Sequence, residues 1–577
     1  RHSFPTRRSS DLQTGVTIRA STDDTGASSM GGDWFLESHT GVNLKTIYFT
    51  EAIDTYQGTL RISSQKQTYS NSKAFAPGGV QAWGENANTT GPGNITYVSQ
   101  NYGNISSNVI AIYSITSAFA ALKTDGSVVA WGFVYNTSDG GNTNYPNSNG
   151  TNLTSGVVNI YSTLYAFAAL KSNGSVFTWG DTTYGGNSSS VSSSLSSGVV
   201  EIYSNNTAFA ALKSDGSVVT WGNIYDGGSL NSVYYNNGWT YTSVADKVTS
   251  NVIKIYTNNS IFAALKSDGS VVTWGRRDYG GSLDIVTYSN GTLVFTSVAN
   301  NLSSNVVAIY SNNYALAALK SDGSVVTWGN AANGGDSSSV AGSLTSNVIA
   351  IYSTNYAFAA LKSNGSVVVW GDQNNGGNSN YPSSNGSSLT SNVVAIYSTD
   401  YAFSALKRNG SVITWGGGNA SMQTFSSESN TTVSVSSNLT SGVIMIYSNS
   451  GAFAALKSDG SVVTWGDSLY GGRMSVNISI TPNVGDTARY VNSISSLLTS
   501  NVAAIYSNYY AFAALKTDGR LVAWGYSDTF VHPHFFINYG YGGDIYSQGS
   551  TAGSALSSGI ISAYFTNRAG ADRKSVV

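Results

Sequence analysis

The sequence contains no cysteine among its 577 residues, which excludes disulfide bonds and thiolate metal sites. Charged residues make up only 10% of the chain, against roughly 25% in ordinary soluble domains. With a formal net charge of −2, we expect no binding of nucleic acid or of an anionic membrane surface. No run of about 18 apolar residues occurs, so we also predict no insertion into a membrane.

Histidine is nearly absent, and four are present: His2, His39, His532 and His534. His532 and His534 flank a proline, but no carboxylate or thiolate accompanies them, and two exposed loop histidines are the plainer interpretation. No Ser-His-Asp set can be inferred. The Gly-Gly pairs lack the Lys-Ser/Thr and the helix of a phosphate loop. We therefore predict no catalytic residue, no metal site and no cofactor, and a protein that is not an enzyme.

What the chain does contain is apolar, aromatic and turn-forming. Hydrophobic residues make up 41% and aromatic residues 12%, with 63 glycines. This composition is too apolar for a disordered chain, and Gly, Ser, Asn and Thr suit turn-rich β structure. A cysteine-free, lysine-poor chain rich in Ser and Asn also favours an exported bacterial protein, so we predict an extracellular or cell-surface location.

The two ends of the chain resemble translated sequencing adapters. Residues 1–12 contain HSFPTRRSSDL, and residues 572–577 read DRKSVV, which resembles the reverse complement of the same adapter. The alternative for residues 1–12 is a basic N-terminal arm. We expect both ends to be foreign and the chain to be a fragment of a longer protein.

Residues 13–60 do not belong to the repeat that follows. Residues 26–37 and 56–60 are similar to the end of an uncharacterised module that commonly opens very large bacterial surface and adhesin-like proteins. The resemblance implies export and says nothing about chemistry.

A Trp-Gly pair recurs ten times along the rest of the chain, at intervals of 42 to 59 residues. One unit, residues 305–329, reads NVVAIYSNNYALAALKSDGSVVTWG. Such self-similarity is the signature of a repeat architecture. The ten tryptophans are Trp83, Trp131, Trp179, Trp221, Trp274, Trp328, Trp370, Trp415, Trp465 and Trp524.

Each unit also carries a turn signal between two β-prone runs. Asn-Gly and Asp-Gly pairs accept positive φ and are the strongest short-range hairpin signal, so each repeat predicts an antiparallel hairpin. The first unit has Pro77-Gly78-Gly79 at this place. The Asn and Asp of the other pairs are Asp125, Asn173, Asp215, Asp268, Asp322, Asn364, Asn409, Asp459 and Asp518.

The strands beside this turn are apolar on both faces, as residues 357–361 and 367–370 show. A strand buried on both sides needs layers above and below it, which radially stacked blades provide. We predict an all-β β-propeller of four-stranded antiparallel blades, with about seven blades plus extra repeats of a second, truncated ring, and almost no helix. A single open or enlarged ring is an alternative, and a parallel β-solenoid is the competing architecture.

The pattern ALKSDGSVVTWG, followed in most units by Gly-Gly as at Gly334-Gly335, resembles the regulator of chromosome condensation repeat. That family folds as a seven-bladed propeller, and the resemblance covers roughly residues 68–567. Ten Trp-Gly units exceed seven, and residues 556–567 begin an eleventh. We therefore assign residues 61–567 to ten propeller repeats plus a truncated eleventh.

A lysine precedes the turn in nine repeats, and two interpretations are open. The lysines could form a basic ring that attracts an anion, or they could be solvated caps that discourage edge pairing. They are Lys123, Lys171, Lys213, Lys266, Lys320, Lys362, Lys407, Lys457 and Lys516.

The variable loops are the better place for a binding site, because repeat insertions tend to emerge on one face. Loop aromatics can stack on sugars or anchor a protein partner, unless they pack back on the ring. We predict a non-enzymatic binding or scaffold module of a large secreted or cell-surface protein, contacting glycan or protein through one face. The candidate contact residues are Tyr234, Tyr235, Trp239, Tyr241, Phe535, Phe536, Tyr539 and Tyr541.

The family resemblance implies an alternative function, nucleotide exchange on a small GTPase. Fold does not carry function, and no inserted acidic wedge can be mapped onto this chain. A lyase or glycosidase in the centre of the ring is a third possibility, and it lacks a recurrent carboxylate pair.

Overall fold

The structure is a computed structural model. It describes residues 108–132, 153–231, 243–380, 389–417, 431–472, 497–507, 511–518 and 521–525, apart from residues 117 and 291. Short strands elsewhere are also described: β1 Asp24–Gly26, β2 Thr59–Arg61, β3 Gln81–Ala82, β27 Gln423–Ser426, β35 Ser527–Asp528, β36 Tyr539–Gly540, β37 Ile560–Phe565 and β38 Gly570–Lys574.

Nine repeats within the described ranges each form three consecutive strands that pair antiparallel. The first strands are β4 Val109–Ser114, β7 Val157–Ser162, β10 Val199–Ser204, β13 Val252–Thr257, β18 Val306–Ser311, β21 Val348–Ser353, β24 Val393–Ser398, β29 Val443–Ser448 and β32 Val502–Ser507. The second strands are β5 Ala118–Lys123, β8 Ala166–Lys171, β11 Ala208–Lys213, β14 Ile261–Lys266, β19 Ala315–Lys320, β22 Ala357–Lys362, β25 Ala402–Lys407, β30 Ala452–Lys457 and β33 Ala511–Lys516. The third strands are β6 Val128–Gly132, β9 Val176–Gly180, β12 Val218–Gly222, β15 Val271–Gly275, β20 Val325–Asn330, β23 Val367–Gly371, β26 Val412–Gly416, β31 Val462–Gly466 and β34 Leu521–Gly525.

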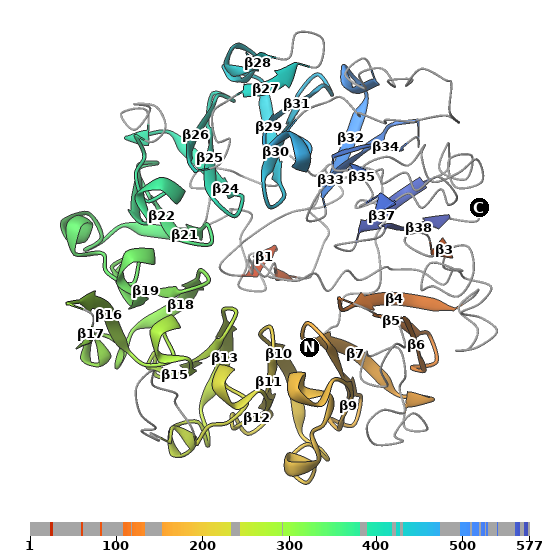
Figure 1. The fold of residues 1–577 in the computed structure, drawn as a ribbon, viewed down its shortest axis with the longest axis vertical. Helices are drawn as coiled ribbons and strands as arrows, with labels where there is room; N and C mark the ends of the chain where they lie inside the picture. The colour runs from red at the N-terminus through yellow and green to blue at the C-terminus, as the bar shows by residue number, and fades with distance from the viewer. Residues whose placement is uncertain are drawn as a thin grey trace.

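These sheets follow one another around a ring, with the first strands toward the centre and the third strands toward the rim (Figure 1). Antiparallel pairing inside each of these nine repeats is what the hairpin signal predicts and a parallel solenoid does not. The all-β, propeller-like fold is therefore confirmed. Eight of the nine described repeat sheets have three strands and one has five, so the fourth strand of each predicted blade and the number of blades stay predictions.

The predicted hairpin lies between the second and third strands, as Lys213–Ser217 illustrates. Lys213 N donates to Ser217 O, and Gly216 N donates to Lys213 O, both at 2.9 Å. Only the glycine has positive φ, at 76°, whereas the Asp215 carboxylate accepts hydrogen bonds from the N–H and hydroxyl of Ser217 at 2.9 and 2.6 Å. The pairing was predicted correctly, but the acidic residue serves as a hydrogen-bond acceptor rather than at positive φ.

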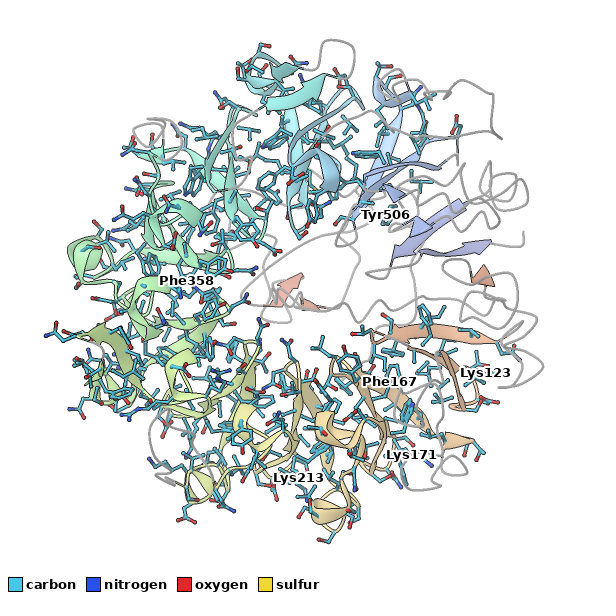
Figure 2. The ribbon with its side chains drawn as sticks, in the orientation of Figure 1. Lys123, Phe167, Lys171, Lys213, Phe358 and Tyr506 are labelled. Carbon is cyan, nitrogen blue, oxygen red and sulfur yellow. The ribbon has the colours of Figure 1, made fainter. Side chains whose placement is uncertain are left out.

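The core of most described blades is built around one stacked Phe–Trp pair, and the β18–β20 blade has Leu316 opposite Trp328 instead. Phe358 and Trp370 face each other across β22 and β23 and stack with ring centroids 5.3 Å apart. Both are buried, with 0% and 2% of their surface exposed. Figure 2 labels Phe167 and Phe358, which hold the same position in two blades. Burial of such rings supplies several kcal/mol each by area alone.

Neighbouring blades are joined by the tryptophan of one and the first glycine of the Gly-Gly pair of the blade before it. The Trp370 indole N–H donates to Gly334 O at 3.0 Å. Gly334 has φ 97°, and a Cβ there would come within 2.7 Å of Phe358 Cδ2, while a Cβ on Gly335 would overlap the Gly329 carbonyl. The Gly-Gly pair is therefore required by close approach. The same bond forms at Trp221, Trp274, Trp328, Trp415 and Trp524.

One described joint departs from this rule. Six residues after Trp415 the sequence has Ser421, where six other repeats have glycine at this place. The indole of the following repeat, Trp465, instead donates to the Thr414 hydroxyl at 3.1 Å. The buried N–H thus keeps a partner where the glycine is missing, as buried polar groups require.

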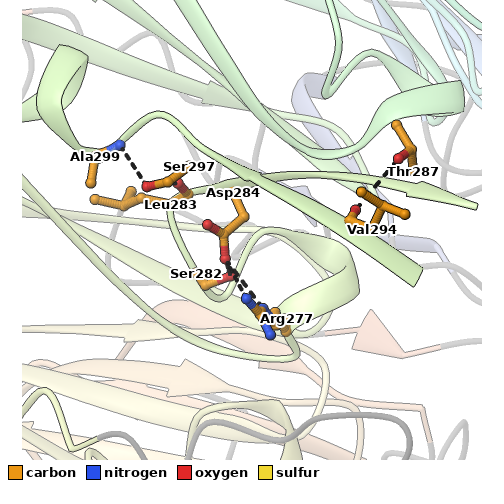
Figure 3. A network of polar contacts seen from close by, with 8 residues as sticks. All are labelled: Arg277, Ser282, Leu283, Asp284, Thr287, Val294, Ser297 and Ala299. Atoms are coloured by element: carbon orange, nitrogen blue, oxygen red, sulfur yellow. Dashed lines mark hydrogen bonds and ion pairs between the residues drawn. The ribbon is translucent and has the colours of Figure 1, made fainter. Parts of the chain in front are cut away.

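The repeat that contains β18–β20 carries two further strands, β16 Asp284–Ser289 and β17 Thr292–Ser297. β16 pairs with β20 in parallel through Ile285 and Val286, and β17 forms the outer edge. Figure 3 shows how this hairpin is fixed: the Arg277 guanidinium bonds the Asp284 carboxylate at 2.9 Å, which also accepts from the Ser282 hydroxyl at 2.8 Å. A similar hairpin, β27 with β28 Thr431–Ser434, follows β26.

Helices are short within the described residues, and none is long enough to cross a membrane. They are one- or two-turn segments: Thr182–Gly186, Ser189–Val191, Ile224–Asp226, Ala245–Lys247, Arg277–Tyr279, Ala299–Leu302, Ala331–Asn333, Ser338–Ser343, Gln373–Asn375, Ser436–Leu439 and Ser468–Tyr470. Among the short outlying strands, β3 pairs with β38 and β38 with β37. Residues 572–574 of β38 belong to the adapter-like end.

Candidate functional site

Only one of the eight predicted contact residues falls among the described residues. Tyr539 begins β36 and pairs with Asp528 of β35. His39, His532 and His534 also lie outside the described residues. The described parts hold no group of three or more His, Cys, Asp or Glu side chains placed to bind a metal. The candidates outside them are Tyr234, Tyr235, Trp239, Tyr241, Phe535, Phe536 and Tyr541.

The two ends of each blade form two different faces of the ring. At one end lie the turns between first and second strands together with the one-turn helices that follow Trp-Gly, and we call this the turn face. The link between them is direct: Asn258 Nδ2 donates to Tyr279 O at 3.0 Å, and Thr354 Oγ1 donates to Asn375 O at 2.9 Å. At the other end lie the hairpins with the nine lysines, and we call this the lysine face.

Polar side chains inside most of the described turns hold the turn face in shape. The buried Asn312 side-chain oxygen accepts hydrogen bonds from the N–H groups of Tyr314 and Ala315 at 2.8 and 2.7 Å. Because Asn and Thr side chains readily bond nearby backbone groups, they suit this turn better than an apolar residue. The same position is Thr163, Asn205, Asn258, Thr354, Thr399 or Asn449 in other repeats.

Backbone hydrogen bonds also connect the turns from blade to blade. Asn313 N donates to Asn355 O, Asn355 N to Asp400 O, and Asp400 N to Ser450 O, at 2.9–3.3 Å. The hydroxyl of Ser353 adds a bond to Ser311 O at 2.8 Å. The turns of the turn face are therefore connected by hydrogen bonds from blade to blade rather than being independent loops.

Four tyrosine side chains form a row on the turn face. Ring centroids are 4.9 Å apart between Tyr279 and Tyr314, 5.5 Å between Tyr314 and Tyr356, and 5.8 Å between Tyr356 and Tyr401. At one end of the row, the Arg276 guanidinium lies over the aromatic ring of Tyr279, 4.3 Å from its centroid. Tyr401 is 42% exposed. The four residues come from four neighbouring repeats, so the row follows the curve of the ring.

The row is interrupted by small residues in other repeats. The position of Tyr314 is Thr207, Ser260 or Gly451 elsewhere. Tyr279 occupies the row in the repeat that has Ser260, and a Cβ on Gly451 would touch the ring of Tyr470. A tyrosine from the one-turn helix thus takes the place of a missing tyrosine in the turn.

Tyr279 and Tyr356 of the row are neutral hydrogen-bonding groups at physiological pH. Burial raises the pKa of Tyr356, and the neighbouring Tyr314 and Tyr401 raise it further. Burial likewise raises the pKa of Tyr279, while Arg276 lowers it. The row can therefore offer aromatic edges and phenol hydroxyls, which is a surface suited to sugars and to polar protein groups.

The lysine face differs from the turn face because its lysine ammonium groups donate hydrogen bonds to backbone carbonyls of the same chain. Lys213 Nζ donates to Ser194 O at 3.0 Å, and Lys362 Nζ donates to Ser343 O at 2.7 Å. Nearby, hydrogen bonds from Ser217 lower the pKa of Asp215 and keep it ionised. The lysines bond carbonyls of the preceding loop, and both interpretations from the sequence, a basic ring that attracts an anion and solvated caps that discourage edge pairing, stay predictions. The same bond forms at Lys266, Lys320, Lys457 and Lys516.

The first strands carry a further regular feature, a β-bulge at the second residue. Val200 is left out of the register between β10 and β11 and is 53% exposed. Tyrosines further along these strands are half-buried or buried, and Figure 2 labels one of them, Tyr506. Burial raises the pKa of Tyr256 and of Tyr310, each to about 12. The exposed apolar residues at the bulge are Val158, Val200, Ile253, Val307 and Ile444.

Sequence reasoning missed the tyrosine row. Tyr314 belongs to the apolar run 314–319, and a run buried on both faces suggests a core position for its first residue. The signal that could have found the row is the alternation of Tyr with Thr, Ser and Gly at this one position, since core positions of the same strand hardly vary.

Comparison with known proteins places part of the chain. Residues 9–60 match the family model described as "Domain of unknown function (DUF4347)". No curated protein matches the sequence.

Among solved structures, the chain is similar to Prp20p from Saccharomyces cerevisiae, with 18% identity over 52% of this chain and 82% of that chain and a TM-score of 0.29. It is similar to human WBSCR16, with 18% identity over 51% of this chain and 89% of that chain and a TM-score of 0.29. It is also similar to the designed protein Ika8, with 14% identity over 64% and 96% of the two chains and a TM-score of 0.26. These TM-scores are low, so the propeller-like fold rests on this chain's own sheets.

Proposed function

We propose that this chain is a non-enzymatic binding module that contacts a protein or glycan through its turn face. The observation that carries the proposal is the row Tyr279, Tyr314, Tyr356 and Tyr401, whose rings contact one another across four neighbouring repeats. Tyrosine provides a large contact area with a polar tip and few rotatable bonds, which is why it dominates many binding surfaces.

The scaffold beneath the row supports this proposal. Each turn is fixed by a buried Asn or Thr and by backbone bonds to the next turn, as between Asn355 and Asp400 at 2.9 Å. A rigid surface loses little conformational entropy when it binds, so more of the contact energy appears as affinity.

In the sequence, the predicted contact loop directly follows a described segment of the turn face. Residues 232–242 follow the one-turn helix Ile224–Asp226, whose last residue bonds the turn through Thr207 Oγ1 at 2.8 Å. We propose that Tyr234, Tyr235, Trp239 and Tyr241 extend the contact surface that the tyrosine row begins.

Glycan and protein arrays probed with the full chain test this function. Replacing Tyr314, Tyr356 and Tyr401 together with alanine is expected to weaken binding of any ligand found by about 30-fold or more, because truncating one dominant aromatic costs about 2 kcal/mol. The matching Tyr→Phe variant separates the contribution of the hydroxyls from that of the rings.

Asp322→Asn on the lysine face is the matched control. Asn364 and Asn409 occupy this turn position naturally in other repeats, so the variant keeps the fold and the affinity. A ligand that binds the alanine variant as tightly as the native chain would contradict the proposal.

We further propose that the chain belongs to a large secreted or cell-surface protein. The cysteine-free composition and the N-terminal segment support this location. An antibody against the turn face should label intact producing cells, whereas labelling only after lysis would contradict an exposed location.

A further inference from the structure

The β16–β17 hairpin stands at the outer rim of the ring, away from the centre (Figure 1). It extends one blade to a five-stranded sheet in the order β17-β16-β20-β19-β18. Among the described residues β17 pairs with β16 alone, so its other side is a sheet edge.

Other blades cover their outer edge with their own chain. Val218 N, in the third strand β12, donates to Val248 O of the following loop at 3.0 Å, and Val176 N in β9 donates to Leu195 O at 3.0 Å. The blade that carries the hairpin has the same bond at its own third strand, where Val325 N of β20 donates to Leu344 O at 2.9 Å. The loop thus caps one end of the third strand in these repeats, and no such bond is found for β17 within the described residues.

The sequence of β17 has none of the usual protections of an edge strand. It reads TLVFTS, with no charge and no proline. Natural proteins usually protect exposed edges with lysine, proline, bulges or short strands, because an open edge templates pairing with another chain. Thr292, Thr296 and Ser297 are exposed, and Val294 is 45% exposed. An uncharged, regular, six-residue edge indicates that β17 has a strand partner.

The side chains of β17 are self-complementary in one register. Facing residues in an antiparallel pair lie on the same side of the sheet. A two-fold axis between two copies of the strand therefore has to lie between one residue and its own copy. An axis at Val294 places Val294 opposite its own copy, Leu293 opposite Phe295, and Thr292 opposite Thr296. Aromatic, β-branched and Thr–Thr pairs of this kind are favourable across strands.

The same register continues apolar rows across both hairpins. Within the hairpin, Tyr288 faces Leu293 and Val286 faces Phe295. Pairing at Val294 would therefore align Tyr288, Leu293, Phe295 and Val286 in one row over four strands. Tyr288 is 75% exposed, and it would gain an apolar neighbourhood at the end of this row. Arg277 packs 3.4 Å from the Phe295 ring and holds it in place.

We infer that β17 pairs antiparallel with β17 of a second copy of this chain, centred on Val294, so that two rings associate rim to rim. The contact is isologous, because the same strand serves both partners, and it closes as a dimer instead of growing into a filament.

Sedimentation of the full chain across a concentration series tests the inference. The native chain is expected to form dimers, and Val294→Lys is expected to weaken them by about 100-fold or more, since it places like charges directly opposite each other. The Val294→Glu variant by itself should also dimerise more weakly, for the same reason. Mixing the Lys and Glu variants should restore association, because opposite charges then meet across the axis.

Val433→Lys is the matched control, as it makes the same change on β28 of the similar hairpin and should leave the dimer unchanged. Recovery of the mixed pair shows that both variants fold. A monomeric native chain, a Val294→Lys variant that still dimerises, or a mixture that stays monomeric would each overturn the inference. Binding of an unrelated extended peptide to a monomeric native chain would also overturn it, and would identify β17 as a peptide-binding edge.

Discussion

Each repeat contains two regions that differ in how much they vary: the joint to the neighbouring blade and the turn face. At the joints, Phe358, Trp370 and Gly334 have counterparts that recur with the same contacts in repeat after repeat. On the turn face, the position of Tyr356 changes to Thr207 or Gly451 while the turn beneath it stays the same. The periodic residues hold the ring, and the residues that break the period give each sector of its surface a different character.

Trp370→Ala gives the largest expected effect. The indole is buried, stacks on Phe358 and bonds Gly334 O, so its loss leaves a cavity and an unpaired carbonyl. We expect a loss of about 3–5 kcal/mol in the free energy of unfolding, measured by urea denaturation.

Tyr356→Ala on the turn face is the counterpart of this change. It removes two ring contacts, worth about 0.5–1.5 kcal/mol each. Equal losses for Trp370→Ala and Tyr356→Ala would erase the difference between joint and surface.

Gly334→Ala tests the other partner of the same joint. The residue has φ 97°, and its Cβ would lie 2.7 Å from Phe358 Cδ2, so strain and overpacking add to about 3 kcal/mol. Gly342→Ala is the control, because a Cβ there meets nothing within 4 Å and should change stability by no more than about 0.5 kcal/mol. Similar unfolding midpoints for the two variants would contradict the close approach at the joint.

The joints show how far sequence reasoning reaches. The Asn/Asp-Gly pair lies within one hairpin, so its pairing could be predicted from neighbouring residues. The bond from Trp370 to Gly334 joins two repeats, and nothing local to either residue reveals it. The recurrence of Trp-Gly and Gly-Gly marked both positions as important without showing that they touch.

Alkaline pH should destabilise the inner strands. Burial raises the pKa of Tyr256 and Tyr310 to about 12, above the ordinary value of about 10. The folded state therefore holds these protons more tightly, and the stability they contribute is complete below about pH 10 and is lost as pH rises through about 12. The loss is about 2–3 kcal/mol for each tyrosine.

Tyrosinate absorbance and denaturant unfolding between pH 9 and 12, a window set by those pKa values, measure this loss. Tyr310→Phe should remove its own share of the alkaline sensitivity. An unchanged pH profile in this variant would show that Tyr310 ionises as readily in the folded ring as in the unfolded chain.

The smallest expected change in stability comes from replacing two threonines that occupy the same position in different repeats. Thr327 Oγ1 donates to Gly335 O at 3.0 Å, whereas Thr273 Oγ1 is, among the described residues, the one buried side-chain oxygen without a partner. Thr327→Val should cost about 1–2 kcal/mol, and Thr273→Val should be neutral or slightly stabilising. Thermal unfolding of both variants measures the difference, and an equal cost at both positions would contradict it.

The candidate site was harder to predict than the fold, for a physical reason. The sequence directed attention to aromatic residues in long loops, such as Trp239 and Tyr241, because insertions stand out against a repeat. Tyr314 and Tyr356 lie inside the repeat, where an aromatic residue next to Ala-Leu or Ala-Phe has the pattern of a core strand. Their position at the end of the blade decides that they form a surface.

Hydrogen exchange of the full chain with and without a ligand found on the arrays tests the division between joint and surface most directly. The account predicts new protection in the turns around Asn313, Asn355 and Asp400, with the exchange of the lysine-face hairpins unchanged. Protection confined to the hairpins around Gly216 and Gly323 would contradict it.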